Sequence, residues 1–154
     1  MNNEETRIYK IKSYLCDIID TLTNNKNYEI NANMLSKNVN NYSLDKIPTD
    51  KTIRKWIIGV EVDRDVYSFK SRKKYSINEI DNLRNIGFFE KFEDAIETNN
   101  KKGVLPDIEQ VESIECLNCG AMTIAGDNTA IFDIQIQITY RNNKTREEIS
   151  LWKK

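Results

Sequence analysis

The chain has 154 residues, with 23 basic and 24 acidic side chains, three cysteines and no histidine. This length fits a single domain whose core folds without disulfides or metals. The missing histidine excludes Ser-His and Cys-His nucleophile pairs, a histidine base and histidine-containing zinc or iron sites. A net charge of −1 disfavours a dedicated nucleic-acid binder, which needs an excess of Lys and Arg. The composition therefore favours a structural or binding protein without a cofactor.

The N-terminal region carries Glu4 and Glu5 where a secretory signal has basic residues and then an apolar run. No window approaches about 18 consecutive apolar residues, the length that predicts a membrane span. Three cysteines are too few for a secreted disulfide framework. We therefore expect a protein made in the cytoplasm that has no membrane partner. With five glycines, two prolines and no repeat, the sequence shows no interdomain linker.

Helical spacing dominates the first part of the chain, which predicts one helix of about four to five turns with a single apolar face. The asparagine-rich run at residues 24–27 ends it. Its apolar positions are Ile8, Ile11, Leu15, Ile18 and Leu22.

From residue 28 the apolar period changes to two, which predicts a strand over residues 28–34 with one wet face. A second extended segment is expected at residues 42–46, because a residue before Pro48 is pushed out of helical conformation. Residues 52–58 and 60–71 read as further strands, interrupted at Gly59.

A second helix is expected to begin at Ser76, which forms a capping box with Glu79. Gly87 costs about 1 kcal/mol inside a helix, so we expect a break or kink there. Asparagines at 99–100, then Gly103 and Pro106, end the second segment. The helical spacing of its aromatic residues indicates core packing rather than ligand stacking. These aromatic residues are Phe88, Phe89 and Phe92.

The remaining chain reads mostly as sheet. Short strands are expected at residues 111–117 and 121–125, with a turn at 126–128. Residues 131–140 show the cleanest alternation, because isoleucines at 134, 136 and 138 alternate with polar residues. The predicted fold is α+β, with a largely antiparallel sheet packed against an N-terminal helix and a kinked central helix.

The sharpest local motif is Cys-Leu-Asn-Cys-Gly at residues 116–120, the spacing of half a zinc ribbon or of a redox pair. Zinc needs four ligands, and the only further cysteine is Cys16, on the expected first helix. A thioredoxin-type pair needs its first cysteine at a helix N-terminus, whereas Cys116 ends a strand-like segment. We interpret Cys116 and Cys119 as small side chains near a strand end. The alternative is a site completed by another subunit.

Three carboxylates, Glu61, Asp63 and Asp65, alternate along one expected strand and so share a face, as two-metal nucleases require. Arg64 lies on the opposite face. No acid-x-Lys element accompanies them on a neighbouring strand. We interpret this face as solvated or interface-facing, and a small metal-dependent enzyme is the alternative.

A basic cluster follows on the expected loop between strand and helix. Its positions suit contact with phosphate or an acidic partner, but basic loop residues are more often simply solvated. The cluster consists of Lys70, Arg72, Lys73 and Lys74.

Five segments occur in order between residues 40 and 140. They are Tyr-Ser-Leu at 42–44 with Ile-Pro-Thr at 47–49; Phe-Lys-Ser-Arg at 69–72 with Tyr-Ser at 75–76; Asn-Ile-Gly-Phe-Phe-Glu-Lys-Phe at 85–92 with Ile-Glu at 96–97; Asn-Lys-Lys-Gly-Val-Leu-Pro at 100–106; and Thr-Ala at 129–130 with Ile-Gln-Ile-Gln-Ile at 134–138 and Tyr140. In this order they resemble the tail-terminator family of phages of Gram-positive bacteria, also called minor capsid or head-tail joining proteins.

The resemblance implies an α+β protomer that assembles into a hexameric ring, caps the finished tail tube and joins it to the neck. The implied partners are further copies of the chain, the tail tube protein, the sheath of contractile tails and the neck or connector proteins. DNA only passes through the lumen. The implied location is the virion tail or neck, after synthesis in the host bacterial cytoplasm. A different neck component, such as a stopper or head-completion protein, is the main alternative.

The same resemblance places one domain at residues 1–140 and a C-terminal extension at 141–154, where residues 145–152 are a candidate arm to a neighbouring subunit. Cys116 and Cys119 fall outside the family pattern. For the ring, we expect the basic cluster and the turn at Asp127 and Asn128 to contact tube or neck. We expect the acidic face, Glu61, Asp63 and Asp65, to line the channel and repel DNA.

Overall fold

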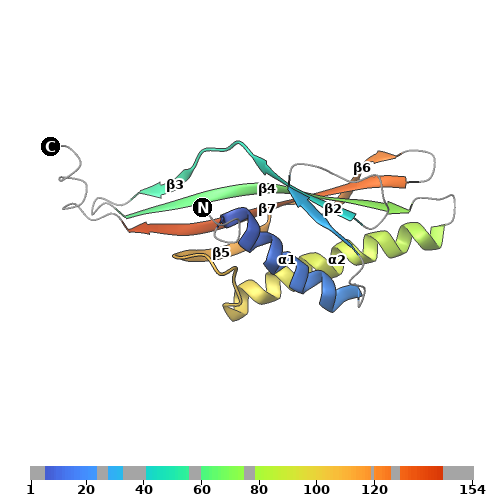
Figure 1. The fold of residues 1–154 in the computed structure, drawn as a ribbon, viewed down its shortest axis with the longest axis horizontal. Coiled ribbons are helices and arrows are strands. Elements are labelled where there is room, and N and C mark those ends of the chain that lie inside the picture. The colour runs from blue at the N-terminus through green and yellow to red at the C-terminus, as the bar shows by residue number, and fades with distance from the viewer. Residues whose placement is uncertain are drawn as a thin grey trace.

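The computed structural model of the chain describes residues 6–23, 28–32, 41–55, 60–74, 79–118, 120–125 and 129–143. Two helices and seven strands lie within these residues (Figure 1). In chain order they are α1 (Arg7–Thr23), β1 (Ile30–Ala32), β2 (Asn41–Ile47), β3 (Thr52–Lys55), β4 (Val60–Lys74), α2 (Glu79–Lys102), β5 (Val111–Cys116), β6 (Ala121–Ala125) and β7 (Thr129–Asn143).

Strands β4 and β7 form the centre of the sheet. Each has 15 residues, and they pair antiparallel over their whole length, from Val60 opposite Asn143 to Lys74 opposite Thr129. The sheet order is β1-β2-β4-β7-β5, with β3 also paired to β4 and β6 also paired to β7. Within the described residues, the short β1–β2 pair is parallel and the other pairs are antiparallel. The predicted α+β class with a mostly antiparallel sheet is therefore confirmed.

Both helices lie on the same side of the sheet, next to each other, and β4 and β7 run on past them (Figure 1). The covered face carries the core, in which Tyr42, Phe69 and Phe92 form a stack of rings with centroids 5.2 and 5.0 Å apart. Burying side chains of this size stabilises the fold by about 1.5–3 kcal/mol each. The isoleucines at 134, 136 and 138 of β7 complete this face, at 1% exposure or less. The alternation predicted for this strand is confirmed.

Helix α1 agrees with the predicted helix in position and in its apolar face. Ile11, Leu15 and Ile18 are buried, while Ile8 and Leu22 pack at the margin of the core. The asparagine-rich run that was expected to end it, residues 24–27, lies outside the described residues. Tyr14 and Ile19 are also buried, which widens the apolar stripe beyond the five positions found by spacing.

Helix α2 corrects the prediction of a break at Gly87, because it runs uninterrupted from Glu79 to Lys102, while a kink at that position stays a prediction. The cost of one glycine is outweighed by the packing of Phe89 and Phe92, which are 1% and 0% exposed. The helix ends as predicted: Gly103 adopts φ 76°, and the amide of Val104 donates to the carbonyl of Asn99 at 2.8 Å. This is a Schellman cap, which needs glycine at the left-handed position. The expected N-cap, Ser76, lies outside the described residues.

The strand predictions hold for β2, β5 and β6, but the bounds of three other strands are wrong. β1 begins at Ile30 instead of residue 28. β4 continues to Lys74 instead of ending at 71, and β7 spans residues 129–143 instead of 131–140. Both extensions arise because the two strands pair with each other beyond their apolar cores, where polar residues hide the strand pattern. Residues 33–34, 56–59 and 126–128, parts of other predicted strands and of the predicted turn, lie outside the described residues.

Candidate functional site

The acidic residues of β4 share one face of the strand, as predicted. Positions 61, 63 and 65 alternate in register with Tyr67 and Phe69, which face the helices. The carboxylates are not open to solvent, however: Asp63 is 1% exposed and Asp65 is 6% exposed, and Glu61 is half-buried. The face is therefore the polar end of the helix-covered surface. Whether it lines a channel in an assembly stays a prediction.

Asp65 is held by two cations from opposite sides. The Arg7 guanidinium, in the first turn of α1, lies 3.5 Å from one carboxylate oxygen, and the Lys46 ammonium of β2 lies 3.4 Å from the other. Arg7 also donates to the Tyr140 hydroxyl at 2.7 Å, and its guanidinium lies 4.3 Å from the centre of that ring. Burial, together with the Asp65 charge, raises the pKa of Tyr140 to about 12. These contacts fasten the start of α1 to the sheet.

Asp63 has its own partners, which come from the first residue of β3 and the residue before it. The Thr52 hydroxyl donates to one oxygen at 2.9 Å, and the Lys51 ammonium lies 3.8 Å from the other. A buried carboxylate is tolerated only when it is paired and hydrogen-bonded in this way. Because Asp63 and Asp65 are both compensated, the acidic face contributes less negative potential than three isolated carboxylates.

A pocket of about 400 Å³ opens beside this ionic cluster. Arg7, Lys46, Lys51 and Arg64 line it together with Asp65, so its walls carry more positive than negative side chains. Across the described residues, no three Cys, Asp or Glu side chains come together in an arrangement suited to a metal ion. The oxygens of Asp63 and Asp65 are already paired with ammonium, guanidinium or hydroxyl groups, so these contacts fasten α1, β2 and β3 to β4.

The basic cluster is not a loop, which corrects the prediction. Residues 70–74 are the last part of β4, and the pleat of the strand divides them between its two faces. Lys70 lies 3.4 Å from Asp45, and Arg72 donates to the Thr129 hydroxyl at 3.3 Å. The side chain of Lys74, and both Asp127 and Asn128, lie outside the described residues. Their expected contacts with tube or neck stay predictions.

Lys73 turns to the opposite face and is buried at 6% exposure. Its ammonium donates to the Tyr42 hydroxyl at 2.9 Å and lies 4.1 Å from the centre of the Phe88 ring. Burial lowers the pKa of Lys73 to about 8. Sequence reasoning treated it as one of four solvated charges. Lys73 is two residues beyond Ser71 and so shares the strand face of Tyr67, Phe69 and Ser71. This period of two was the signal that its side chain points inward.

The cysteine motif lies where β5 passes to β6. Cys116 is the last residue of β5 and packs at the margin of the core, whereas Cys119 lies outside the described residues. The same connection is tied to α2, because the Gly120 amide donates to a Glu93 carboxylate oxygen at 2.6 Å. A Cβ added at Gly120 would lie 2.8 Å from the Phe89 ring. Close packing on α2 therefore explains the glycine that follows the cysteines.

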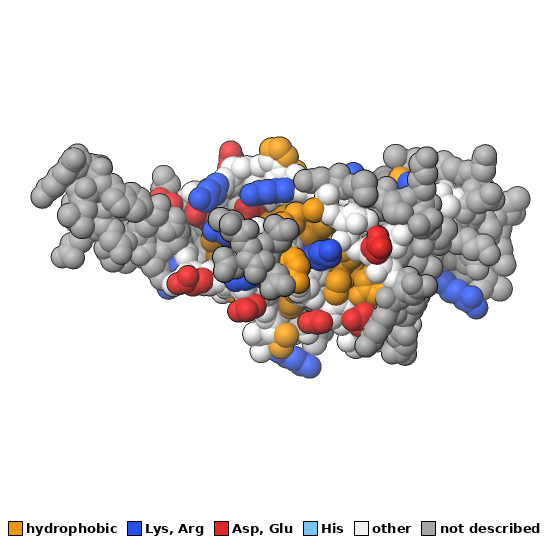
Figure 2. Space-filling model, viewed as in Figure 1, with side chains coloured by type: hydrophobic (Ala, Val, Ile, Leu, Met, Phe, Trp, Pro, Cys, Tyr) orange, Lys and Arg blue, Asp and Glu red, His pale blue; other side chains and the backbone are white. Residues whose placement is uncertain are grey.

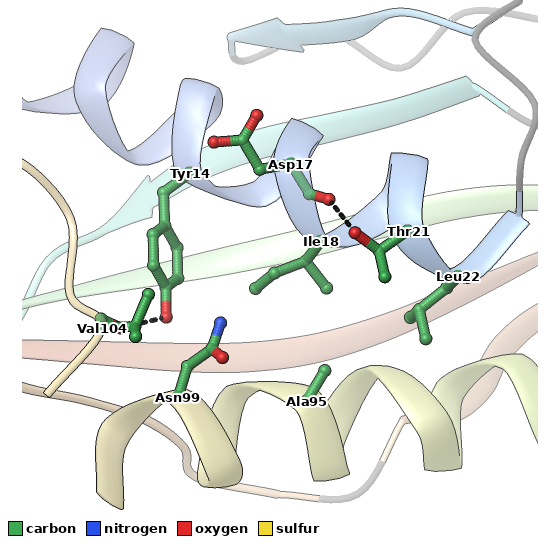
Figure 3. A pocket seen from close by; sticks show the side chains of 8 residues that line it. All are labelled: Tyr14, Asp17, Ile18, Thr21, Leu22, Ala95, Asn99 and Val104. Atoms are coloured by element: carbon green, nitrogen blue, oxygen red, sulfur yellow. Dashed lines mark hydrogen bonds between the residues drawn. The ribbon is translucent and has the colours of Figure 1, made fainter. Parts of the chain in front are cut away.

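Sequence reasoning missed a groove between the two helices (Figure 3). Its cavity of about 210 Å³ is lined by Ile18 and Leu22 of α1 and by Ala95 of α2. Tyr14 crosses one end and donates its hydroxyl to the Val104 carbonyl at 2.8 Å. The helical spacing gave both apolar faces, but it did not indicate that the helices leave space between them.

The chain is thus an α+β protein with a charged pocket beside the start of α1 and a groove between its two helices. In the described part of the chain, neither helix is long and apolar enough to cross a membrane. No protein-family model matches the sequence, and a comparison with curated proteins finds no match.

Proposed function

We propose that the protein is a structural component of a phage tail or phage-tail-like particle, forming a ring that terminates the tail tube and joins it to the neck. The observation that carries the proposal is the order of the family-like segments. They fall on β2, the end of β4, α2 with its cap, and β7, which together build the helix-covered centre of the sheet. The segments lie on elements that pack together, and this supports the proposal.

The edges of the sheet support a role in assembly. Among the described residues, β1, β3, β5 and β6 each pair with a single strand, so each lies at an edge of the sheet. Such edges are a liability in a monomer, and neighbouring subunits can cover them. Heterologous contacts between identical subunits close into a ring when the rotation permits it.

In the proposed mechanism, the ring covers the surface to which the next tube subunit would bind, and polymerisation stops. No catalytic group is needed for this step, because shape and subunit contact do the work. The near balance of 23 basic and 24 acidic side chains suits a ring that meets protein on both sides while DNA passes through.

Deletion of the gene in a producing strain tests the proposal. Without a terminator, tubes grow past their normal length or remain without heads, and electron microscopy of the released particles shows this directly. Tails of normal length with heads attached would contradict the proposal. If the purified protein binds isolated connectors but never the ends of tubes, it is a different neck component.

A further inference from the structure

The groove between the helices continues along α1. The cavity at Ile18 and Leu22 shares Tyr14, Asp17 and Val104 with a second one, of about 510 Å³, between α1 and the segment that follows α2. Together the two cavities form one continuous groove along α1, from Leu22 to the first turns of the helix, and 'the groove' below means both. Figure 2 shows apolar side chains gathered over this part of the molecule, with charged side chains around them.

The chemistry of the groove defines its occupant. The floor is apolar, and Val104, at its rim, is 50% exposed. Asp17 and Asp107 give the rim two negative charges against one positive charge from Lys10. Figure 3 shows the Asp17 carboxylate directed away from α2, outside the apolar floor. A segment with a large apolar side chain followed by basic residues complements this surface.

The chain itself contains such a segment. Residues 144–154, Lys-Thr-Arg-Glu-Glu-Ile-Ser-Leu-Trp-Lys-Lys, follow β7 and combine Trp152 with Lys153 and Lys154. Tryptophan gives a large contact area and is enriched among the residues that dominate binding energy at interfaces. We propose that residues 144–154 of one copy occupy the groove of a second copy, with Trp152 between the helices and the lysines beside Asp17 and Asp107. The inference rests on the proposed ring, for which it supplies an intersubunit contact.

The geometry favours a second copy over the chain's own groove. Tyr140 lies beside Arg7 at the start of α1, and β7 then runs about 10 Å further to Asn143, away from the helices. To fill its own groove the segment must turn back over that distance and then cover about 16 Å along α1 to Ile18. Nine residues from Asn143 to Trp152 span about 30 Å when fully extended. That leaves little length for the reversal.

A fluorescently labelled peptide of residues 144–154 tests the groove, titrated into the full-length Trp152→Ser protein so that the segment of the protein does not compete. We expect saturable binding by fluorescence anisotropy. Ala95→Leu in the same protein fills the floor of the groove and should weaken binding at least tenfold. Leucine is a strong helix former, so α2 is kept, and circular dichroism checks this.

Two controls distinguish binding in the groove from non-specific hydrophobic binding. Met122→Ser removes an apolar side chain on β6 that is 47% exposed and lies away from the groove, and it should leave binding unchanged. A peptide with Trp152→Ser should bind at least tenfold more weakly. Absence of saturable binding, or equal binding by the Ala95→Leu protein, overturns the proposal.

Mixing two full-length variants distinguishes a second copy from self-occupation. Trp152→Ser keeps an intact groove and Ala95→Leu keeps an intact segment, so sedimentation of the mixture should show 1:1 pairs that neither variant forms alone. A mixture without pairs means that the segment does not pass between copies, which overturns the inference. If rings still terminate tubes with both variants, the proposed function survives and this contact does not.

Discussion

The two ends of the helix-covered face are stabilised by different interactions, apolar packing at one end and ion pairs at the other. Over α1 and α2 the face is aromatic and aliphatic, built around Phe69 and Phe92, both 0% exposed. Two residues beyond Tyr67 the same row of β4 reaches Asp65 and then Asp63, which are held by cations from α1, β2 and the start of β3. The change occurs where α1 begins, at Arg7. One strand face can therefore pass from apolar core to ionic cluster without losing burial.

The apolar end should give the largest single effect. Phe92→Ala removes a buried ring that stacks on Phe69 at 5.0 Å, and we expect a loss of about 3–5 kcal/mol in the free energy of unfolding. Urea unfolding followed by circular dichroism measures it. Ile86→Ala, on the same helix but 48% exposed, is the control and should change stability by less than about 0.5 kcal/mol. Equal effects from both variants would mean that α2 does not cover the sheet.

The ionic end should respond less strongly. Asp65→Asn leaves Arg7 and Lys46 without their shared carboxylate, and we expect a loss of about 2–3 kcal/mol, because the carboxylate is buried while both cations reach solvent. Urea unfolding in low and high salt measures the loss and its screening. Asp94→Asn, at an exposed position of α2, serves as control. An unchanged midpoint in Asp65→Asn would show that the cluster contributes nothing to the fold.

Stability should also depend on pH, because Lys73 is a cation buried at the apolar end of this face. Its pKa is about 8 in the folded chain and 10.5 in the unfolded chain, so between these values the unfolded state binds more protons and stability rises with pH. From pH 8 to 10 we expect a gain of about 2 kcal/mol. Above pH 10 the direction reverses, because buried tyrosines such as Tyr42 and Tyr67 have raised pKa values and ionise only on unfolding.

Unfolding midpoints measured from pH 7 to 11 give this curve, and Lys73→Met should flatten its rising part while leaving the fall above pH 10. A rise of the same size in Lys73→Met would assign the pH dependence to other groups.

The smallest expected effects come from the same substitution, glycine to alanine, at two positions. At Gly87 an added Cβ meets nothing within 4 Å, so Gly87→Ala should stabilise the chain by about 1 kcal/mol through helix propensity. At Gly120 an added Cβ would lie 2.8 Å from the Phe89 ring, so Gly120→Ala should destabilise it. Thermal melts of the two variants should therefore move in opposite directions. A shift of the same sign in both would contradict the packing described at Gly120.

The features that the sequence predicted correctly are those that depend on local periodicity and backbone preference. The apolar face of α1, the alternation of β7 and the cap at Gly103 follow from spacing and from backbone preference, and each was located correctly. The break at Gly87 was wrong because packing of Phe89 and Phe92 outweighs the glycine. The basic cluster was misplaced in a loop because pairing with β7 extends β4 through polar residues. Cross-strand partners and the space between two helices depend on tertiary contacts that no local pattern contains.

At the candidate site, too, local patterns were predictable and tertiary contacts were not. Alternation placed Glu61, Asp63 and Asp65 on one face, but it did not reveal Arg7, which is 58 positions away from Asp65 in the chain. Burial of Lys73 depends on Tyr42 and Phe88, which come from two other elements. Residues assigned to tube or neck contact, Asp127 and Asn128 among them, stay predictions because they lie outside the described residues.

The most direct test of the proposed function is polymerisation of the tube protein from the same particle in the presence of this chain, with tube lengths and ends recorded by negative-stain electron microscopy. We expect a ring at one end of each tube and a mean tube length that falls as the chain is added. Tubes with bare ends and unchanged lengths, at concentrations where the chain is folded and in excess, would contradict it.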